Sequence, residues 1–302
     1  MKSLRIIYMG TPDFAVPSLQ RLVEEKQNVV AVITAPDKPQ GRGRKLTGSP
    51  VKAYAESVGL PILQPTNLKS PAFLEELKSF QADVQIVVAF RMLPEAVWNM
   101  PPFGTFNLHA SLLPQYRGAA PIHWAIINGE KETGLTTFFL KHEIDTGAII
   151  FQEKEPITDT DTVGDLYERL MNKGAALVLK TTKSIAKGDY PQKEQAAPKQ
   201  VKTAPKIFKE TCEIDWSQPA QKIYDFIRGL SPFPGAWTLI NGKHYKIYGA
   251  KVLDTQKVEG FETDQKTYLY LQTADNDLAI EDLQLQGKKR MDIVSFLRGN
   301  EI

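Results

Sequence analysis

The sequence predicts an α/β protein in which a mostly parallel sheet with helices on both faces is followed by a small C-terminal β-barrel of the oligonucleotide-binding type. Over the first 188 residues, short apolar runs alternate with amphipathic segments, as in chains that wind helices around a parallel sheet. Beyond residue 206, short apolar runs are separated by Gly, Asn and Asp, as in antiparallel β domains. A chain of 302 residues also exceeds what one core usually supports, so we expect two domains.

The first half supplies the elements of the parallel sheet. Leu4–Met9 is a short apolar run ended by Gly10, and Thr11-Pro12 then predicts the N-cap and first-turn proline of a helix. Val29–Ile33 is expected to be the next buried strand.

Two Ser-Pro pairs, Ser49-Pro50 and Ser70-Pro71, predict the starts of two further helices. Buried strands are expected at Val84–Ala89 and Gly104–His109. Because strands alternate with helices, we expect right-handed crossovers and a mostly parallel sheet that is covered on both faces.

A change in composition predicts the domain boundary. Residues 161–187 have apolar side chains at helical spacing, and Gly188 follows them as a stop signal. Residues 189–206 contain three prolines and much Lys, Gln and Ala but no apolar face, which is typical of a linker. We therefore expect an α/β domain at 1–188, a basic linker at 189–206 and a β-barrel domain at 207–302.

The overall composition narrows the class of protein. Hydrophobic residues make up 42% of the chain and charged residues 24%, as in folded globular proteins. The single cysteine, Cys212, excludes an internal disulfide and fits a reducing compartment. The start lacks the pattern of a signal peptide, and no apolar stretch approaches the roughly 18 residues of a membrane helix. We therefore expect a cytoplasmic protein without a membrane partner.

Basic charge concentrates in the connecting segments. The net charge of +2 is too small to indicate a nucleic-acid partner by itself. Residues 36–52 hold five basic side chains against Asp37, and residues 180–206 hold seven lysines against Asp189 and Glu194. Since lysines in linkers often only keep the chain solvated, the charge alone leaves RNA binding open.

Residues 106–121, FNLHASLLPQYRGAAP, form the most informative stretch. Side chains two apart on a strand point the same way, so Asn107 and His109 share a face at the carboxyl end of their strand, where ligands of open α/β sheets collect. The Asn107 amide can donate to an oxyanion, and His109 can accept a proton near neutral pH. This pair suits acyl transfer to an amine.

Each residue also has a structural interpretation. A strand-end Asn is often a turn former, and a lone His is often a satisfied core group. A second polar cluster, His142 to Gly147, follows the apolar run 135–140 and places Asp145 where it could approach His109. A carboxylate there would fix the tautomer of the imidazole, although Asp before Thr-Gly is also a normal turn residue.

Other binding motifs are excluded. GTPDFA after the first strand lacks the Gly-x-Gly-x-x-Gly spacing of dinucleotide sites, and GRGRK is not a P-loop. The four histidines, His109, His123, His142 and His244, lack metal-ligand spacing, so no metal is expected.

The motifs MGTPDFAVPSL, PDKPQGRGRKLTGSPVK, NLHASLLPQYRGAAPIHWAI and IDTG, in this order, resemble those of the methionyl-tRNA formyltransferases, and the resemblance spans essentially the whole chain. The third motif is shared with formyltransferases that use 10-formyltetrahydrofolate on sugar amines or on glycinamide ribonucleotide. It therefore identifies the chemistry, whereas the basic loop, the linker and the C-terminal stretches IDW, LSPFPGAW and LQLQGKKRM indicate the tRNA acceptor.

The resemblance implies a role for each matching residue. Asn107 would hold the formyl oxygen, His109 would assist proton removal from the attacking amine, and Asp145 would support His109. The cosubstrate 10-formyltetrahydrofolate would be bound by Ser111, Leu112, Leu113 and Pro114, and by Val87, Ala89 and Phe90 of the pterin pocket. The initiator methionyl-tRNA would be contacted by Lys38, Arg42, Arg44, Lys45, Lys206, Lys288 and Lys289. We expect the enzyme to act as a monomer.

Two departures from the family pattern concern these sites. The segment Phe90-Arg91-Met92 replaces a frequent Tyr-Gly segment, and LKHEIDTGA differs from the frequent form around Asp145, although Asp145 and Gly147 keep their places. Three hypotheses remain: a formyltransferase acting on initiator methionyl-tRNA, one acting on a small amine, and a non-catalytic RNA-binding protein.

Overall fold

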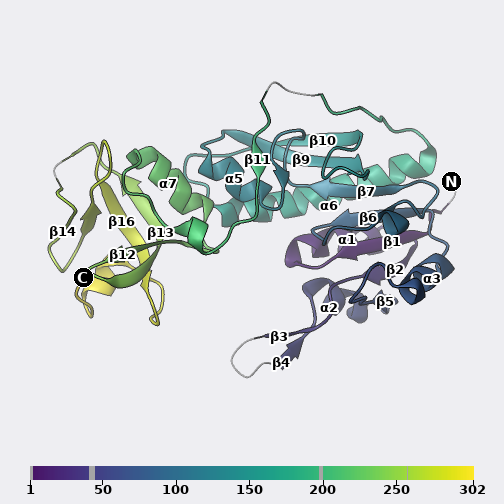
Figure 1. Cartoon of the computed structure of the whole chain (residues 1–302), viewed down its shortest axis with the longest axis horizontal. Helices are drawn as coiled ribbons and strands as arrows, with labels where there is room; N and C mark the ends of the chain where they lie inside the picture. The colour runs from purple at the N-terminus through teal and green to yellow at the C-terminus, as the bar shows by residue number, and fades with distance from the viewer. Residues whose placement is uncertain (1–2, 41–44, 197–199, 257) are drawn as a thin grey trace. The chain divides into compact units, whose positions relative to one another are not determined.

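The computed structural model describes the chain except for residues 1–2, 41–44, 197–199 and 257. It divides into two compact units, each assembled from three stretches of chain (Figure 1). The first unit comprises Met1–Arg117, Gly134–Glu155 and Tyr167–Lys202, and the second comprises Gly118–Thr133, Pro156–Leu166 and Thr203–Ile302. The continuous division at 1–188, 189–206 and 207–302 stays a prediction.

The first unit is built on a seven-stranded sheet with the order β10-β9-β7-β6-β1-β2-β5. The strands are β1 (Ile6–Gly10), β2 (Val29–Ile33), β5 (Ile62–Leu63), β6 (Val84–Val88), β7 (Thr105–His109), β9 (Glu132–Phe139) and β10 (Ile149–Pro156). The pairs from β5 across to β7 are parallel, whereas β7 pairs with β9 in the antiparallel direction. The predicted mostly parallel sheet is therefore confirmed.

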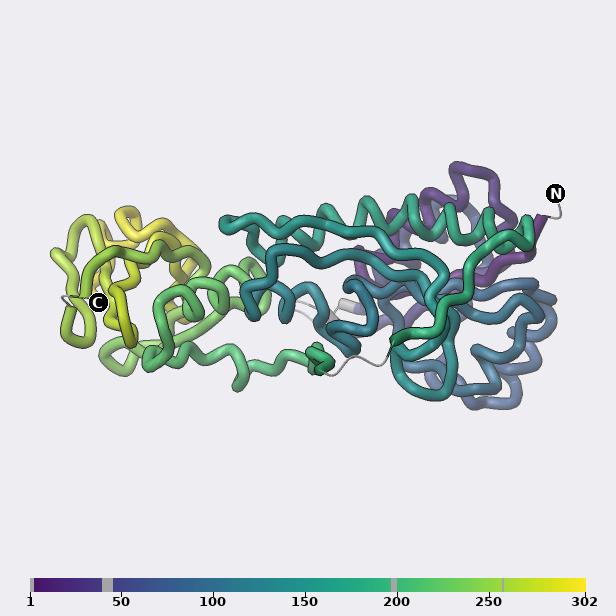
Figure 2. The backbone as a smooth tube through the Cα atoms, turned by 90° about the horizontal axis from the view of Figure 1, so that it is seen from above, coloured from purple at the N-terminus to yellow at the C-terminus, as the bar shows by residue number. Residues whose placement is uncertain are grey.

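Helices cover both faces of this sheet, as predicted (Figure 2). On one face, Phe73 and Leu77 pack in a buried cluster with Ile7 and Val87 of the strands. On the other face, a β-carbon at Gly174 would lie 2.7 Å from the Leu108 side chain of β7. The helix that contains Gly174 therefore packs closely on β7. The helices are α1 (Val16–Glu24), α2 (Pro50–Ser57), α3 (Pro71–Ser79), α4 (Glu95–Trp98) and α6 (Val163–Lys187).

Local capping differs in part from the prediction. The Ser49 side chain caps α2 by accepting a hydrogen bond from the Lys52 backbone N–H, whereas Ser70 makes no such bond before α3. The predicted start at Thr11-Pro12 is wrong, because Asp13–Ala15 form the 3-10 turn η1 and α1 begins at Val16. The buried Tyr8 hydroxyl donates to the Ala15 carbonyl and so holds this turn against β1.

The second unit contains an antiparallel sheet with the order β12-β13-β16-β15-β14, and β17 pairs with β16. The strands are β12 (Ala236–Ile240), β13 (Lys243–Val252), β14 (Phe261–Thr263), β15 (Leu269–Leu271), β16 (Leu278–Leu285) and β17 (Met291–Asp292). This curled sheet, barrel-like but open over the residues described, confirms the predicted β-type C-terminal fold. The remaining elements are α5 (Pro121–Ile127), η2 (Glu210–Cys212), α7 (Ala220–Gly229), α8 (Ile293–Leu297) and the short pair β8 (Arg117–Gly118) with β11 (Thr203–Ala204).

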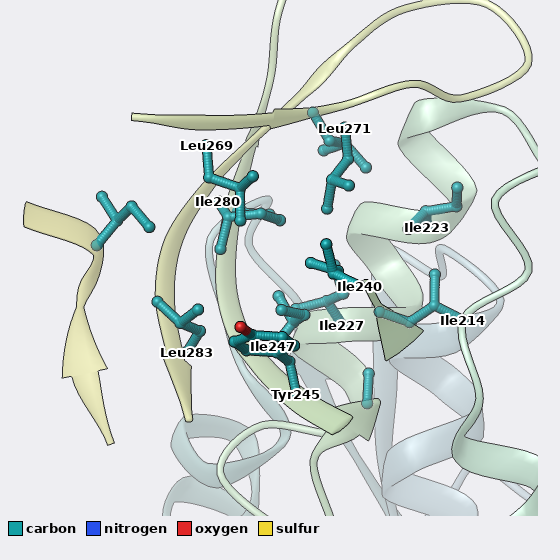
Figure 3. Close-up of a cluster of buried hydrophobic side chains, with 14 of the residues drawn as sticks. Ile214, Ile223, Ile227, Ile240, Tyr245, Ile247, Leu269, Leu271, Ile280 and Leu283 are labelled. Atoms are coloured by element: carbon teal, nitrogen blue, oxygen red, sulfur yellow. The ribbon is translucent and has the colours of Figure 1, made fainter. Parts of the chain in front are cut away.

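The core of the second unit lies between its sheet and α7. Ile223 and Ile227 of the helix belong to one buried cluster with Ile247 and Leu283 of the strands, and Figure 3 draws these side chains. Elsewhere, none of the helices in the described part of the chain combines the length and apolar character needed to cross a membrane.

Shortening a buried side chain in this core should lower the stability of the protein. Leu283 is fully buried in β16, so Leu283→Ala should lower the free energy of unfolding by about 2 to 5 kcal/mol through lost contacts and a residual cavity. Leu239 on β12 is 57% exposed, so Leu239→Ala should change stability by less than about 0.5 kcal/mol. Urea unfolding of both variants tests the assignment, and equal losses would contradict it.

A buried carboxylate in the first unit should make stability depend on acid pH. Glu155 is 4% exposed and pairs with Lys173 and, at 2.7 Å, with Arg169. Burial raises its pKa, but the hydrogen bonds and charges of Lys173 and Arg169 outweigh burial and leave the pKa below its ordinary value. The ionised group therefore stabilises the fold above its unfolded pKa of about 4.3.

That contribution is lost as the pH falls through the lower, folded pKa. Glu155→Gln should accordingly reduce stability at pH 7 and make unfolding less sensitive to pH below about 4. Urea midpoints measured from pH 2 to 7 check this, and curves of equal acid dependence for both proteins would speak against it.

Candidate active site

The candidate site lies at the carboxyl ends of β6 and β7. Asn107 and His109 are two positions apart on β7 and so share a face, as expected. In register, Asn107 lies between Val87 of β6 and Phe138 of β9, and His109 lies beside Thr136 of β9. The sheet thus presents an amide and an imidazole at one edge.

The tautomer of His109 follows from its hydrogen-bond partner. His109 is 6% exposed, and its Nε2 lies 2.8 Å from the backbone oxygen of Tyr116. Because a carbonyl can only accept, Nε2 carries the hydrogen in the neutral ring, and Nδ1 keeps its lone pair. Nδ1 is therefore the basic nitrogen of this site.

Asp145 faces that basic nitrogen. Its Oδ2 lies 3.9 Å from His109 Nδ1, which is too long for a hydrogen bond but close enough for electrostatic attraction at a buried position. The carboxylate therefore faces the ring nitrogen that carries no hydrogen in the neutral ring. The Tyr116 carbonyl, and not Asp145 as we expected, sets the neutral tautomer.

Asn107 supplies the hydrogen-bond donors. Its side chain is half-buried, and its carboxamide has no hydrogen-bond partner among the residues the structure describes. Its N–H groups are consequently available to a bound molecule. An unpaired donor and a base with a facing anion are the groups that stabilise an oxyanion and remove a proton.

The loop after β7 holds the predicted folate-binding residues in different environments. The Ser111 hydroxyl donates to the Gln115 carbonyl at 2.6 Å, and Leu113 is buried with Phe138 and Ile149. Ser111 and Leu113 therefore hold the loop in place. Leu112 and Pro114 are only half-buried, so their side chains are the more accessible part of the loop.

The segment after β6 carries the remaining folate candidates. Val87 is buried in the core, Phe90 packs partly against that core, and Ala89 is exposed with a left-handed φ of 47°. Arg91 donates to the Thr66 carbonyl at 3.2 Å, and its guanidinium lies 5.7 Å from the Phe90 ring centroid. The unusual Phe90-Arg91-Met92 segment is thus tied to the neighbouring loop.

The predicted tRNA contacts are scattered along the chain. Arg42 and Arg44 lie outside the described residues, as does the Lys45 side chain, whereas Lys38 is exposed on strand β3 (Lys38–Gln40), which pairs with β4 (Lys45–Thr47). Lys288 and Lys289 are exposed beyond β16. Lys206 is exposed, with its ammonium 5.3 Å from the Phe208 ring centroid.

Three residues at the site carried no signal in the sequence. Tyr116 acts through its backbone carbonyl, which no side-chain pattern reports. Thr136 Oγ donates to the Ser111 carbonyl at 2.6 Å and accepts from the Leu113 N–H at 3.1 Å. Gln195, in the predicted linker, donates to the Asp145 carbonyl at 2.8 Å. Their partners lie between 7 and 50 positions away, so only the folded chain brings them together.

Comparison with known proteins gives a consistent result. A family model described as formyl transferase matches residues 2–182, and one described as formyl transferase, C-terminal domain, matches residues 206–301. A protein from Parabacteroides distasonis named methionyl-tRNA formyltransferase is 57% identical over 313 residues, covering 99% of this chain and 96% of that protein. A protein of the same name from Phocaeicola vulgatus is 58% identical over 311 residues, with the same coverage of 99% and 96%.

Solved structures share the fold at low identity. WlaRD, a sugar 3N-formyl transferase crystallised with dTDP and 5-N-formyl-THF, matches with a TM-score of 0.69 at 23% identity, covering 96% of this chain and 100% of that chain. HypX from Aquifex aeolicus, in complex with tetrahydrofolic acid, matches with a TM-score of 0.66 at 17% identity, covering 96% of this chain. The present chain covers 46% of HypX, about half of its length.

Proposed function

The chain belongs to the methionyl-tRNA formyltransferases of the formyl transferase family, and on that premise we propose that Asn107, His109 and Asp145 form its catalytic site. The enzyme transfers a formyl group to the free α-amino group of methionyl initiator tRNA. The observation that carries the site assignment is the meeting of an unpaired amide with an imidazole whose Nδ1 faces a carboxylate.

The formyl donor is derived from folate, and we propose 10-formyltetrahydrofolate. The residues present fit such a donor. Leu112, Pro114 and Phe90 offer partly exposed apolar surface for a ring system beside Asn107, and the Asn107 amide is free to bind the formyl oxygen. Asn107 and His109, which share a face of β7, would then both act on the carbon that is transferred.

In the proposed reaction, His109 Nδ1 accepts a proton from the attacking amine as its nitrogen bonds to the formyl carbon. Asn107 donates to the oxygen that becomes negative, and Asp145 stabilises the imidazolium. His109 then returns the proton to the folate nitrogen as the bond from that nitrogen to the carbon breaks. Two proton transfers balance one bond formed and one broken, and no covalent bond to the enzyme is needed.

The tRNA acceptor is supported by the names of the full-length relatives and by the exposed lysines at 38, 206, 288 and 289. The names of these relatives favour neither of the two alternatives, a small-amine formyltransferase and a non-catalytic RNA-binding protein. A cytoplasmic location and a monomeric state belong to the same proposal.

Removal of either catalytic group should abolish most turnover without unfolding the protein. Asn107→Ala removes the oxyanion donor and should lower kcat by about 10²- to 10³-fold. His109→Gln keeps an N–H donor for the Tyr116 carbonyl but lacks a base, and it should also lose most turnover. Formylation assays with urea midpoints and tRNA binding as controls test both variants. Near-normal formylation by either variant would refute the site assignment.

The acceptor can be identified by competition between substrates. Charged initiator tRNA should be formylated efficiently, whereas charged elongator tRNA and small amines should be poor substrates.

Because lysines neutralise phosphates, tRNA affinity should fall steeply with salt concentration. Lys289→Ala should reduce the slope of a plot of log affinity against log salt concentration by about one unit. Salt-independent formylation of a small amine would favour the first alternative, and no turnover with any acceptor would favour the second.

A further inference from the structure

A short stretch of the predicted linker lies against the loop that carries Asp145. We name Lys193–Gln195 the connector strap. Lys193 forms an isolated antiparallel bridge with Ile149, through backbone hydrogen bonds of 2.8 and 2.9 Å. The bridge brings Gln195 beside the turn that precedes β10.

The Gln195 side chain binds two carbonyls of that turn. Its Nε2 donates to the Asp145 carbonyl at 2.8 Å and to the Gly147 carbonyl at 2.9 Å. Its Oε1 accepts from Arg117 Nε at 3.2 Å and from Nη2 at 2.6 Å. Because arginine only donates, this contact sets which end of the amide faces the turn, and the charge of the guanidinium strengthens the bond.

The turn needs such support because its backbone is constrained. Asp145 has a left-handed φ of 54°, which residues other than glycine rarely adopt. Gly147 is pressed against β9, since a β-carbon there would lie 1.6 Å from the Phe139 carbonyl oxygen. The place of the Asp145 carboxylate therefore depends on how the backbone of this turn is held.

Two adjacent residues, Tyr116 and Arg117, hold His109 and the turn that carries Asp145. Tyr116 accepts the hydrogen bond from His109 Nε2, and Arg117 orients Gln195, which binds the Asp145 turn. The dipeptide Tyr116-Arg117 is thus linked to the His109 imidazole through Tyr116 and to the Asp145 turn through Arg117 and Gln195.

We propose that Gln195, oriented by Arg117, is a positioning residue that places the Asp145 carboxylate opposite His109 Nδ1. The inference rests on the proposed catalytic function of Asp145. It gives a residue of the predicted linker a part in catalysis that is separate from any contact with RNA.

The test is a double-mutant cycle measured by single-turnover formylation. Gln195→Ala should lower the rate by about tenfold, because even a small displacement of a catalytic group slows the reaction, with little change in KM for either substrate. Gln195→Glu keeps the length and the Arg117 contact but has no N–H to donate, so it should match the alanine variant. In an Asp145→Asn background, Gln195→Ala should cause no further loss.

The matched control lies in the same strap. Glu194→Ala removes a neighbouring side chain that is 80% exposed and that, among the described residues, reaches only the Lys141 ammonium, at 3.9 Å, so its rate should equal that of the wild type. Urea midpoints verify folding of each variant.

The outcomes separate the two proposals. A wild-type rate for Gln195→Ala, or an equal loss with and without the Asp145 carboxylate, would overturn the positioning role while leaving the catalytic site intact. Full activity of Asp145→Asn alone would instead overturn the proposed role of Asp145, and the inference with it.

Discussion

The hydrogen bond from His109 Nε2 to the Tyr116 carbonyl decides what the site can do. It ties the imidazole at the end of β7 to the loop that follows, and it leaves Nδ1 as the only nitrogen able to accept a proton. Asp145 gains its significance from that choice, because its carboxylate lies on the Nδ1 side of the ring. With the opposite tautomer, Nδ1 would carry a hydrogen already and could not take one from an amine.

The parallel sheet makes this arrangement possible. Register places Val87, Asn107 and Phe138 in one row across β6, β7 and β9, so the Asn107 amide lies beside a strand end from which the pterin candidates Ala89 and Phe90 continue. Because β9 runs antiparallel to β7, its last residue, Phe139, lies beside Phe106 near the start of β7, and the loop that follows brings Asp145 back to within 3.9 Å of His109. The Asn107 amide, the His109 imidazole and the Asp145 carboxylate therefore come together from two distant segments of the chain. Each of these residues lies in a strand or within a few residues of one.

The sequence predicted the parts of this protein that depend on local periodicity. The alternation of strands and helices and the β-type C-terminal fold could be inferred, as could the shared face of Asn107 and His109, because side-chain direction on a strand follows from spacing alone. The start of α1 was misplaced, since the Tyr8 hydroxyl holds Asp13–Ala15 in a 3-10 turn through a tertiary contact. The Tyr116 carbonyl and Gln195 could not be predicted, because a backbone acceptor has no side-chain signature and a glutamine in a linker resembles solvated chain.

The state of the His109 ring is the most direct test of this account, and ¹⁵N NMR of the histidine-labelled enzyme measures it. Comparison with His109→Gln assigns the signals among the four histidines. At a pH where the ring is neutral, the account predicts a protonated Nε2 and an unprotonated Nδ1. A neutral ring with its hydrogen on Nδ1 would contradict the proposed role of His109 as the base, because the nitrogen that faces Asp145 would then be unable to accept the proton of the amine.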